Sequence, residues 1–192
     1  MKRLLVALFL SIGAFLYSAP LISSPIPVSA GKFAVYAASD FFMGTNTVGD
    51  LFMASIRYGL PFGGETGIRI LKEGVIGDFK FSVLYSDPFT TGIDTGFGFV
   101  SGITELFFSF FLDIAFEPEF AVFFSVRWEY PALYCLDISN LEGTEGVSFS
   151  PRIGFEILRN YFLSFVLEAG LSRNWKSEDF GFSTSCLVVW KI

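Results

Sequence analysis

The chain has 192 residues, a length that favours a single domain. Hydrophobic residues make up 52% of it, 26 residues are Phe, and only 17% are charged, against roughly 25% in ordinary soluble domains. This composition argues against an ordinary soluble globule. The chain contains no histidine, which excludes sites that use imidazole as a base or a metal ligand. Its net charge of -6 argues against a nucleic-acid partner.

The first thirty residues have the layout of a secretory signal peptide. Two cations at the start precede an apolar run from Leu4 to Leu16, and the next charge comes only after residue 30. Of two candidate cleavage sites, after Ala19 and after Ala30, the second is preferred because small residues precede it and no proline follows it. The sequence therefore predicts a signal peptide at 1–30 and one domain at 31–192. An uncleaved helical anchor is the alternative, but the apolar run is short for a span of about 20 residues.

From residue 51 onward, the sequence alternates between apolar and polar side chains. Phe52, Ile56 and Tyr58 are apolar, whereas Ser55 and Arg57 between them are polar. A period of two is typical of a β-strand with two different faces. Ten strands are predicted in this way, near residues 32–39, 51–60, 65–72, 76–85, 92–100, 103–116, 119–130, 146–158, 160–171 and 179–191.

The chemistry of the two faces distinguishes the possible all-β architectures. One face carries Phe, Val, Ile and Leu, and the other mixes Gly and Ser with isolated charges of both signs. A soluble β-sandwich carries charges freely on its wet face, whereas a transmembrane barrel turns its apolar face to lipid and its polar face to a crowded lumen. Closure also removes unpaired strand edges, which lipid does not tolerate. The sequence predicts an antiparallel up-and-down transmembrane β-barrel of about ten strands, with eight as the alternative.

One segment also fits a helical membrane protein. The stretch Phe97–Phe116 is long and hydrophobic enough for a helical span, and its polar residues Glu105, Ser109 and Asp113 lie four apart. Its composition favours strands, because Phe and Gly outnumber Leu and Ala, and Ser-Gly at 101–102 is a turn signal. The alternating neighbours favour the barrel.

The connections between the predicted strands divide into two groups. Those at 61–64, 86–91, 117–119 and 159–160 are mostly short, as periplasmic turns of outer-membrane barrels are. The two longest, Asp40–Asp50 and Pro131–Glu145, fall at the opposite end. We therefore expect them to be exposed loops that meet an external ligand or protein.

By its strand pattern, the chain resembles the small outer-membrane β-barrel proteins, of which the OmpA and OmpX barrels are members. The resemblance covers residues 31–192 and rests on the alternation alone. It implies an outer-membrane location and insertion by the outer-membrane assembly machinery. Members of this class usually end in an aromatic residue, whereas this chain ends in Ile192 after Trp190.

The polar face of the predicted strands points into the lumen. At eight to ten strands a barrel interior is about filled by side chains, so buried charges must be paired. The sequence supplies carboxylates but no nucleophile motif, metal cluster or glycine-rich phosphate loop, so we expect no catalytic, cofactor or metal site. The predicted lumen-facing polar network consists of Arg57, Glu65, Arg69, Asp78, Lys80, Asp94, Glu105, Asp113, Arg127, Glu129, Arg152, Glu156, Glu168 and Lys191.

Two cysteines, Cys135 and Cys186, form an even pair in an exported chain, which makes a disulfide conceivable. Cys186 is expected on the lipid face and Cys135 near a loop, so two unpaired thiols are the preferred interpretation.

The leading functional hypothesis is a non-enzymatic outer-membrane barrel in a lipid bilayer, with a salt-bridged interior and a structural or surface-interaction role. A narrow porin-like channel for small solutes is the second hypothesis. A soluble secreted β-sandwich or lipid carrier is the third.

Overall fold

The structure, a computed structural model, describes residues 27–44, 48–71, 74–100, 103–130, 146–175 and 180–192. These residues form ten β-strands and one short 3-10 turn, η1 at Pro61–Gly63. The strands are β1 Phe33–Gly44, β2 Val48–Leu60, β3 Gly64–Leu71, β4 Gly74–Ser86, β5 Phe89–Val100, β6 Ile103–Glu117, β7 Phe120–Tyr130, β8 Ser148–Ile157, β9 Leu163–Asn174 and β10 Phe180–Lys191.

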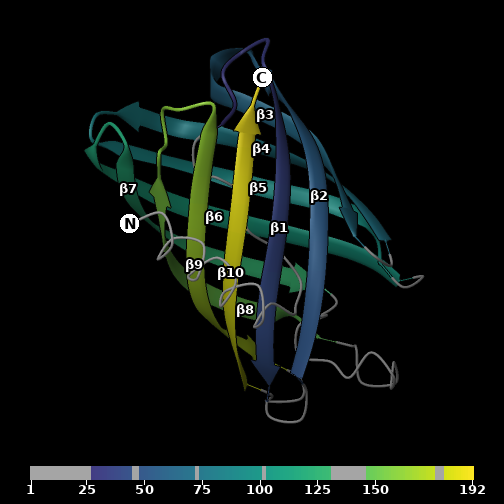
Figure 1. Cartoon of the computed structure of the whole chain (residues 1–192). Coiled ribbons are helices and arrows are strands. Elements are labelled where there is room, and N and C mark those ends of the chain that lie inside the picture. The colour runs from purple at the N-terminus through teal and green to yellow at the C-terminus, as the bar shows by residue number, and fades with distance from the viewer. Residues whose placement is uncertain (1–26, 45–47, 72–73, 101–102, 131–145, 176–179) are drawn as a thin grey trace, which may run out of the picture.

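The ten strands form one closed barrel in which each strand pairs with its neighbours in the sequence and β1 pairs with β10 (Figure 1). Every pairing is antiparallel, and Ala34 of β1 pairs with Arg57 on one side and Lys191 on the other. The predicted up-and-down barrel of ten strands is confirmed. The β-sandwich and the eight-stranded alternative are wrong, because all ten alternating segments join a single closed sheet.

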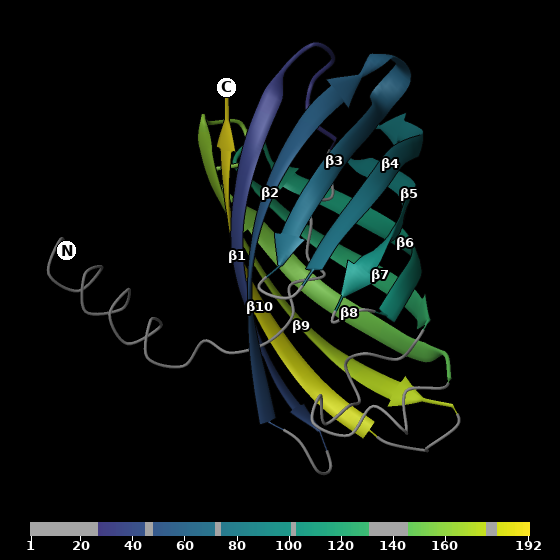
Figure 2. The ribbon, with the colours of Figure 1, turned by 90° about the vertical axis from the view of Figure 1, so that its right-hand side faces the viewer.

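Side chains alternate between the inside and the outside of the barrel along each strand. In β2, Met53, Ser55 and Arg57 are buried, whereas Phe52 and Ile56 at the alternate positions are exposed. This alternation continues around the ring, and the strands wrap around the lumen at a tilt (Figure 2). The apolar side chains therefore cover the outer surface, which is the opposite of a soluble protein.

The two ends of the barrel differ in their connections. One end, here the inner end, carries the start of β1, the end of β10 and the turns at 61–63, 87–88, 118–119 and 158–162. Both Figure 1 and Figure 2 place the carboxyl terminus there. The opposite, outer end carries the connection between β7 and β8. Residues 131–145, which contain the predicted loop and Cys135, lie outside the described residues.

The predicted outer loop Asp40–Asp50 is largely wrong. β1 continues to Gly44 and β2 begins at Val48, and the two strands stay paired up to Met43 and Val48. The acidic residues at 40 and 50 suggested a loop. Phe41 and Met43 nevertheless continue the apolar alternation, so the strand extends through them. Only residues 45–47 separate the strands.

The helical alternative for residues 97–116 is also wrong, since this stretch ends β5 and forms most of β6. Within the described ranges, no helix is both long and apolar enough to cross a membrane.

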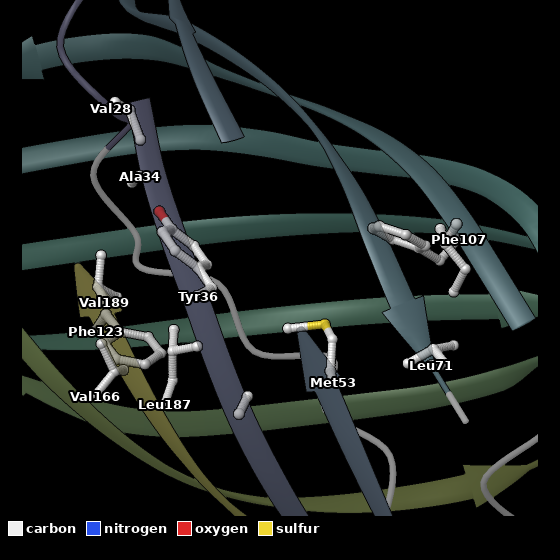
Figure 3. Packing of buried hydrophobic residues seen from close by; sticks show 12 residues of the cluster. Val28, Ala34, Tyr36, Met53, Leu71, Phe107, Phe123, Val166, Leu187 and Val189 are labelled. Carbon is white, nitrogen blue, oxygen red and sulfur yellow. The ribbon is translucent and has the colours of Figure 1, made fainter. Parts of the chain in front are cut away.

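A small apolar cluster lies inside the barrel beside the charged side chains. Figure 3 shows Tyr36 of β1 between two groups of this cluster, one with Phe123 and Leu187 and the other with Met53 and Phe107. The full cluster comprises Val28, Ala34, Tyr36, Ala38, Met53, Leu71, Ile76, Phe107, Phe123, Val166, Leu187 and Val189. The interior thus combines apolar packing with buried charge.

Candidate functional site

The barrel lumen collects the side chains that the sequence singled out. Of the fourteen predicted members of the polar network, thirteen are buried, and the side chain of Lys191 at the inner end is 33% exposed. The antiparallel register brings these side chains from different strands onto one inward surface. They fall into three groups.

The first group spans β2, β3 and β4. Arg57 is paired with Glu65, and its two terminal nitrogens donate to both oxygens of Asp78, at 2.9 and 2.6 Å. Gly67 lies between Arg57 and Asp78 in the same row of the sheet, and a Cβ there would be 3.1 Å from the Arg57 Cγ. The glycine therefore leaves room for the arginine to cross β3. Lys80 adds a contact of 3.1 Å to the Glu65 carboxylate.

The first group extends to β5 through Arg69. Its Nε is paired with Asp78, and its Nη2 donates to Asp94 at 2.9 Å. Asp78 thus accepts from both Arg57 and Arg69, and two arginines are held together by one carboxylate. Such sharing keeps opposite charges alternating where water does not reach, which offsets their desolvation.

The second group lies across the barrel on β6 to β9. Arg127 contacts Glu105 at 3.2 Å and Glu129 at 3.8 Å, and Arg152 donates to Glu168 at 3.0 Å. Glu105, Arg127 and Glu129 lie in the outer half of their strands, and Arg152 and Glu168 lie near the middle of theirs. The group contains more carboxylates than cations, and the hydroxyl of Ser148 lies 3.5 Å from Glu129.

The third group closes the inner end. Arg159, in the turn between β8 and β9, is paired with Asp113 of β6. Lys191 lies 3.7 Å from Glu156, and its Nζ donates to the backbone carbonyl of Arg159. The sequence analysis missed Arg159 because it lies in a turn, where a period of two gives no signal. The predicted set contains eight carboxylates and six cations, and this excess of carboxylates was the sequence hint that a cation was missing.

An aromatic ring joins the first group to the second. The Cζ of Arg127 lies 3.7 Å from the centroid of the Phe107 ring, and the Cζ of Arg69 lies 5.0 Å from it. Arg57 contacts the ring of Tyr36 in the same way, at 5.3 Å. Cations over aromatic faces are stabilised by the ring quadrupole, more so where water is excluded.

Inward-facing glycines accommodate the rings that fill the lumen. A Cβ on Gly96 would lie 2.2 Å from the Phe107 ring, and a Cβ on Gly154 would lie 2.4 Å from the Phe123 ring. Each ring thus lies directly on the backbone of the neighbouring strand. The ring-on-glycine contacts join Phe107 to Gly96, Phe111 to Gly92 and Phe123 to Gly154.

The site offers few groups for other chemistry. In the part of the chain that the structure describes, no three Asp, Glu or Cys side chains converge in a way that could hold a metal ion. Cys186 of β10 is a free thiol that is partly covered.

No family model and no curated protein matches the chain. Among solved structures, the NanC porin is 10% identical, with a TM-score of 0.52, over 83% of this chain and 100% of the other. A de novo designed transmembrane β-barrel is 12% identical, with a TM-score of 0.42, over 87% and 100%. The outer membrane channel DcaP of Acinetobacter baumannii is 12% identical, with a TM-score of 0.37, over 93% and 69%.

The fold is a closed, ten-stranded antiparallel β-barrel similar to that of the NanC porin. At these identities the likeness concerns the fold alone, and the closed ring of ten strands carries it together with the porin match.

The outer surface of the barrel has the features expected of a lipid-facing wall. Aromatic side chains gather near both ends, with Phe33 against Tyr58 at the inner end, their ring centroids 4.8 Å apart, and Trp128 against Phe149 at the outer end, 5.5 Å apart. Aromatic girdles of this kind flank the apolar band of membrane barrels.

Proposed function

We propose that this protein is a non-enzymatic outer-membrane barrel whose lumen is closed by its own side chains and whose outer connections meet external partners. The filled interior carries the proposal. Buried arginines are paired with carboxylates, and Phe107 and Phe123 lie directly on the glycines of neighbouring strands. A water-filled path needs open space across the lumen. Rings that contact the backbone of the neighbouring strand fill that space.

The same features support an outer-membrane location. A wall with an apolar band and two aromatic girdles suits a lipid bilayer, and short inner turns suit the periplasmic side of an outer membrane. Residues 1–30 would direct export, and the assembly machinery would insert the barrel. In this orientation the connection 131–145 is on the cell surface. An epitope inserted there is expected to bind antibody on intact cells, whereas an epitope at the 118–119 turn is expected to bind only after permeabilisation.

The closed lumen is tested by conductance in planar bilayers. The purified protein is expected to give no discrete current steps. A variant in which Phe107, Phe111 and Phe123 are all replaced by Ala is expected to give current steps, because three rings that fill the lumen are removed. Reproducible steps from the unaltered protein would overturn the closed-barrel proposal.

A narrow porin-like channel is the second candidate, and the match to a porin at a TM-score above one half favours it. In this case charged side chains of the lumen would line the path of a small solute. The same recordings distinguish the two candidates. A channel conducts without the ring substitutions, and replacing Arg127 by Met would change its preference between anions and cations.

A further inference from the structure

The inner mouth of the barrel contains a short segment ahead of β1 that enters the lumen. Val28 is 7% exposed and belongs to the apolar cluster with Ala34 and Tyr36 (Figure 3). Its backbone N–H donates to the Oε2 of Glu65 at 2.6 Å. The other oxygen of Glu65 already accepts from Arg57 and contacts Lys80. The amide of Val28 thus supplies a donor to the second oxygen, Oε2.

The same segment presses against β2. Gly59 faces the lumen, and a Cβ there would lie 2.1 Å from the carbonyl oxygen of Ser29 and 2.4 Å from that of Val28. A turn then brings the chain to β1, with Lys32 donating to Ser29 at 3.0 Å and Gly31 donating to the carbonyl of Gly59 at 2.9 Å. Gly59 pairs directly with Glu65 across β2 and β3, so the Gly31 nitrogen is held beside the strand pair that carries this carboxylate.

The preferred cleavage site of the leader falls inside this turn. Hydrolysis of the Ala30–Gly31 peptide bond consumes one water, whose oxygen enters the Ala30 carboxylate and whose hydrogens complete the Gly31 ammonium. Val28 and Ser29 leave with the leader. Oε2 of Glu65 then loses the Val28 amide as a donor, and the space beside Gly59 that Val28 and Ser29 filled is vacated.

We propose that leader removal after Ala30 places the new α-ammonium of Gly31 against Oε2 of Glu65, in the space that Val28 and Ser29 occupy before cleavage. Losing a donor to a buried carboxylate oxygen is costly, and an ammonium held a strand pair away replaces the lost amide with a charged donor. The Gly31 nitrogen donates one bond to the Gly59 carbonyl. An ammonium carries three protons, so it can keep this bond and direct another proton into the space that Val28 and Ser29 vacate.

The processed protein, purified from membranes, tests this in two measurements. Its intact mass is expected to correspond to a chain that begins at Gly31. Its α-amine is expected to react with an amine-directed reagent at pH 7 about tenfold more slowly than in a Glu65→Gln variant, because an ion-paired ammonium keeps its proton and about one pKa unit corresponds to that factor. Glu117→Gln, an exposed carboxylate at the same end, is the matched control and is expected to leave the rate unchanged.

Two further variants keep the proposal falsifiable if Glu65→Gln does not fold. A chain that retains Ala30 moves its ammonium out by one residue and is expected to react about tenfold faster than the processed form. Gly59→Ala is expected to fold in the processed form, because the three atoms nearest to a Cβ there belong to Val28 and Ser29, which leave with the leader. A mature chain that still contains Val28, or equal labelling rates in all forms, would overturn the proposal. The outcome is independent of whether the lumen conducts.

Discussion

The guanidinium of Arg127 stacks on the Phe107 ring inside the barrel, with its Cζ 3.7 Å from the ring centroid. Phe107 faces Arg69 as well, so one apolar ring separates two charged groups and contacts a cation of each. A ring in this position performs two tasks that usually fall to different residues. It fills space, and it stabilises cations that have left water.

Replacing Phe107 by Ala should therefore destabilise the barrel strongly. Removing a buried ring from a packed core costs about 3–5 kcal/mol, and two arginines lose a ring contact as well. Phe110 of the same strand is exposed on the outer face, so Phe110→Ala is the control and should cost clearly less. Urea unfolding in lipid vesicles, followed by tryptophan fluorescence, measures both. Equal losses for the two variants would contradict the inward placement of Phe107.

Gly96 and Phe107 should be coupled. A Cβ on Gly96 would lie 2.2 Å from the Phe107 ring, so Gly96→Ala forces the ring to move and should lower stability. In a Phe107→Ala background the clash is absent, and the cost of Gly96→Ala should shrink by about 0.5–3 kcal/mol, the usual range for contacting residues.

The control for this cycle is Gly77→Ala. Gly77 faces outward and the nearest atom to a Cβ there is 3.9 Å away, so its effect should be the same with and without Phe107. Additive effects at Gly96 would show that the ring does not lie on this glycine.

The strands could be predicted from the sequence because period-two alternation is a local signal. In a membrane barrel this signal is strong, since one face of each strand meets lipid and the other meets a polar lumen. A charge such as Arg57 or Lys80 has only one tolerable face, so each one also fixes the register of its strand. The structure buries both residues in the lumen. The outer loop at 40–50 was mispredicted because acidic residues at 40 and 50 obscured the alternation of Phe41 and Met43.

The aromatic filling of the lumen could not be predicted in the same way. β6 carries apolar residues on both faces, so its alternation does not say that Phe107 and Phe111 point inward. Their spacing of two from Glu105 and Asp113 contains that information, but only once β6 is known to be a strand. Which inward carboxylate pairs with which cation depends on the register between strands, and Arg159 reaches Asp113 from a turn.

Removing only Arg159 from its pair with Asp113 should cost more stability than replacing both residues. Arg159→Met leaves the buried Asp113 carboxylate without its cation, which typically costs about 3–5 kcal/mol. The double variant that adds Asp113→Asn should regain part of this loss, because no buried charge then lacks a partner. Arg173→Met, which alters an exposed arginine, should change the free energy of unfolding by less than about 0.5 kcal/mol. A double variant less stable than Arg159→Met alone would contradict this account of the inner end.

The facing of alternate residues can be measured directly by spin labelling. The outer face exposes Phe124 and Phe155, and Phe81 is half-buried there, whereas Lys80, Arg127 and Arg152 are buried inside. A slip of one residue would exchange these sets and place every charge in hydrocarbon. Each arginine near the bilayer midplane of a barrel's lipid face costs about 2–4 kcal/mol, so the register is strongly determined.

Single cysteine variants at these six positions, in a background with Cys135 and Cys186 replaced by Ser, carry the label into lipid or into the lumen. Labels at the three Phe positions should collide freely with oxygen, which concentrates in lipid, and weakly with a water-soluble relaxant. Labels at the three charged positions should show little contact with oxygen, because they lie within a packed interior. Relaxant contact at the Phe positions combined with oxygen contact at the charged positions would mean that the strands are in the opposite register.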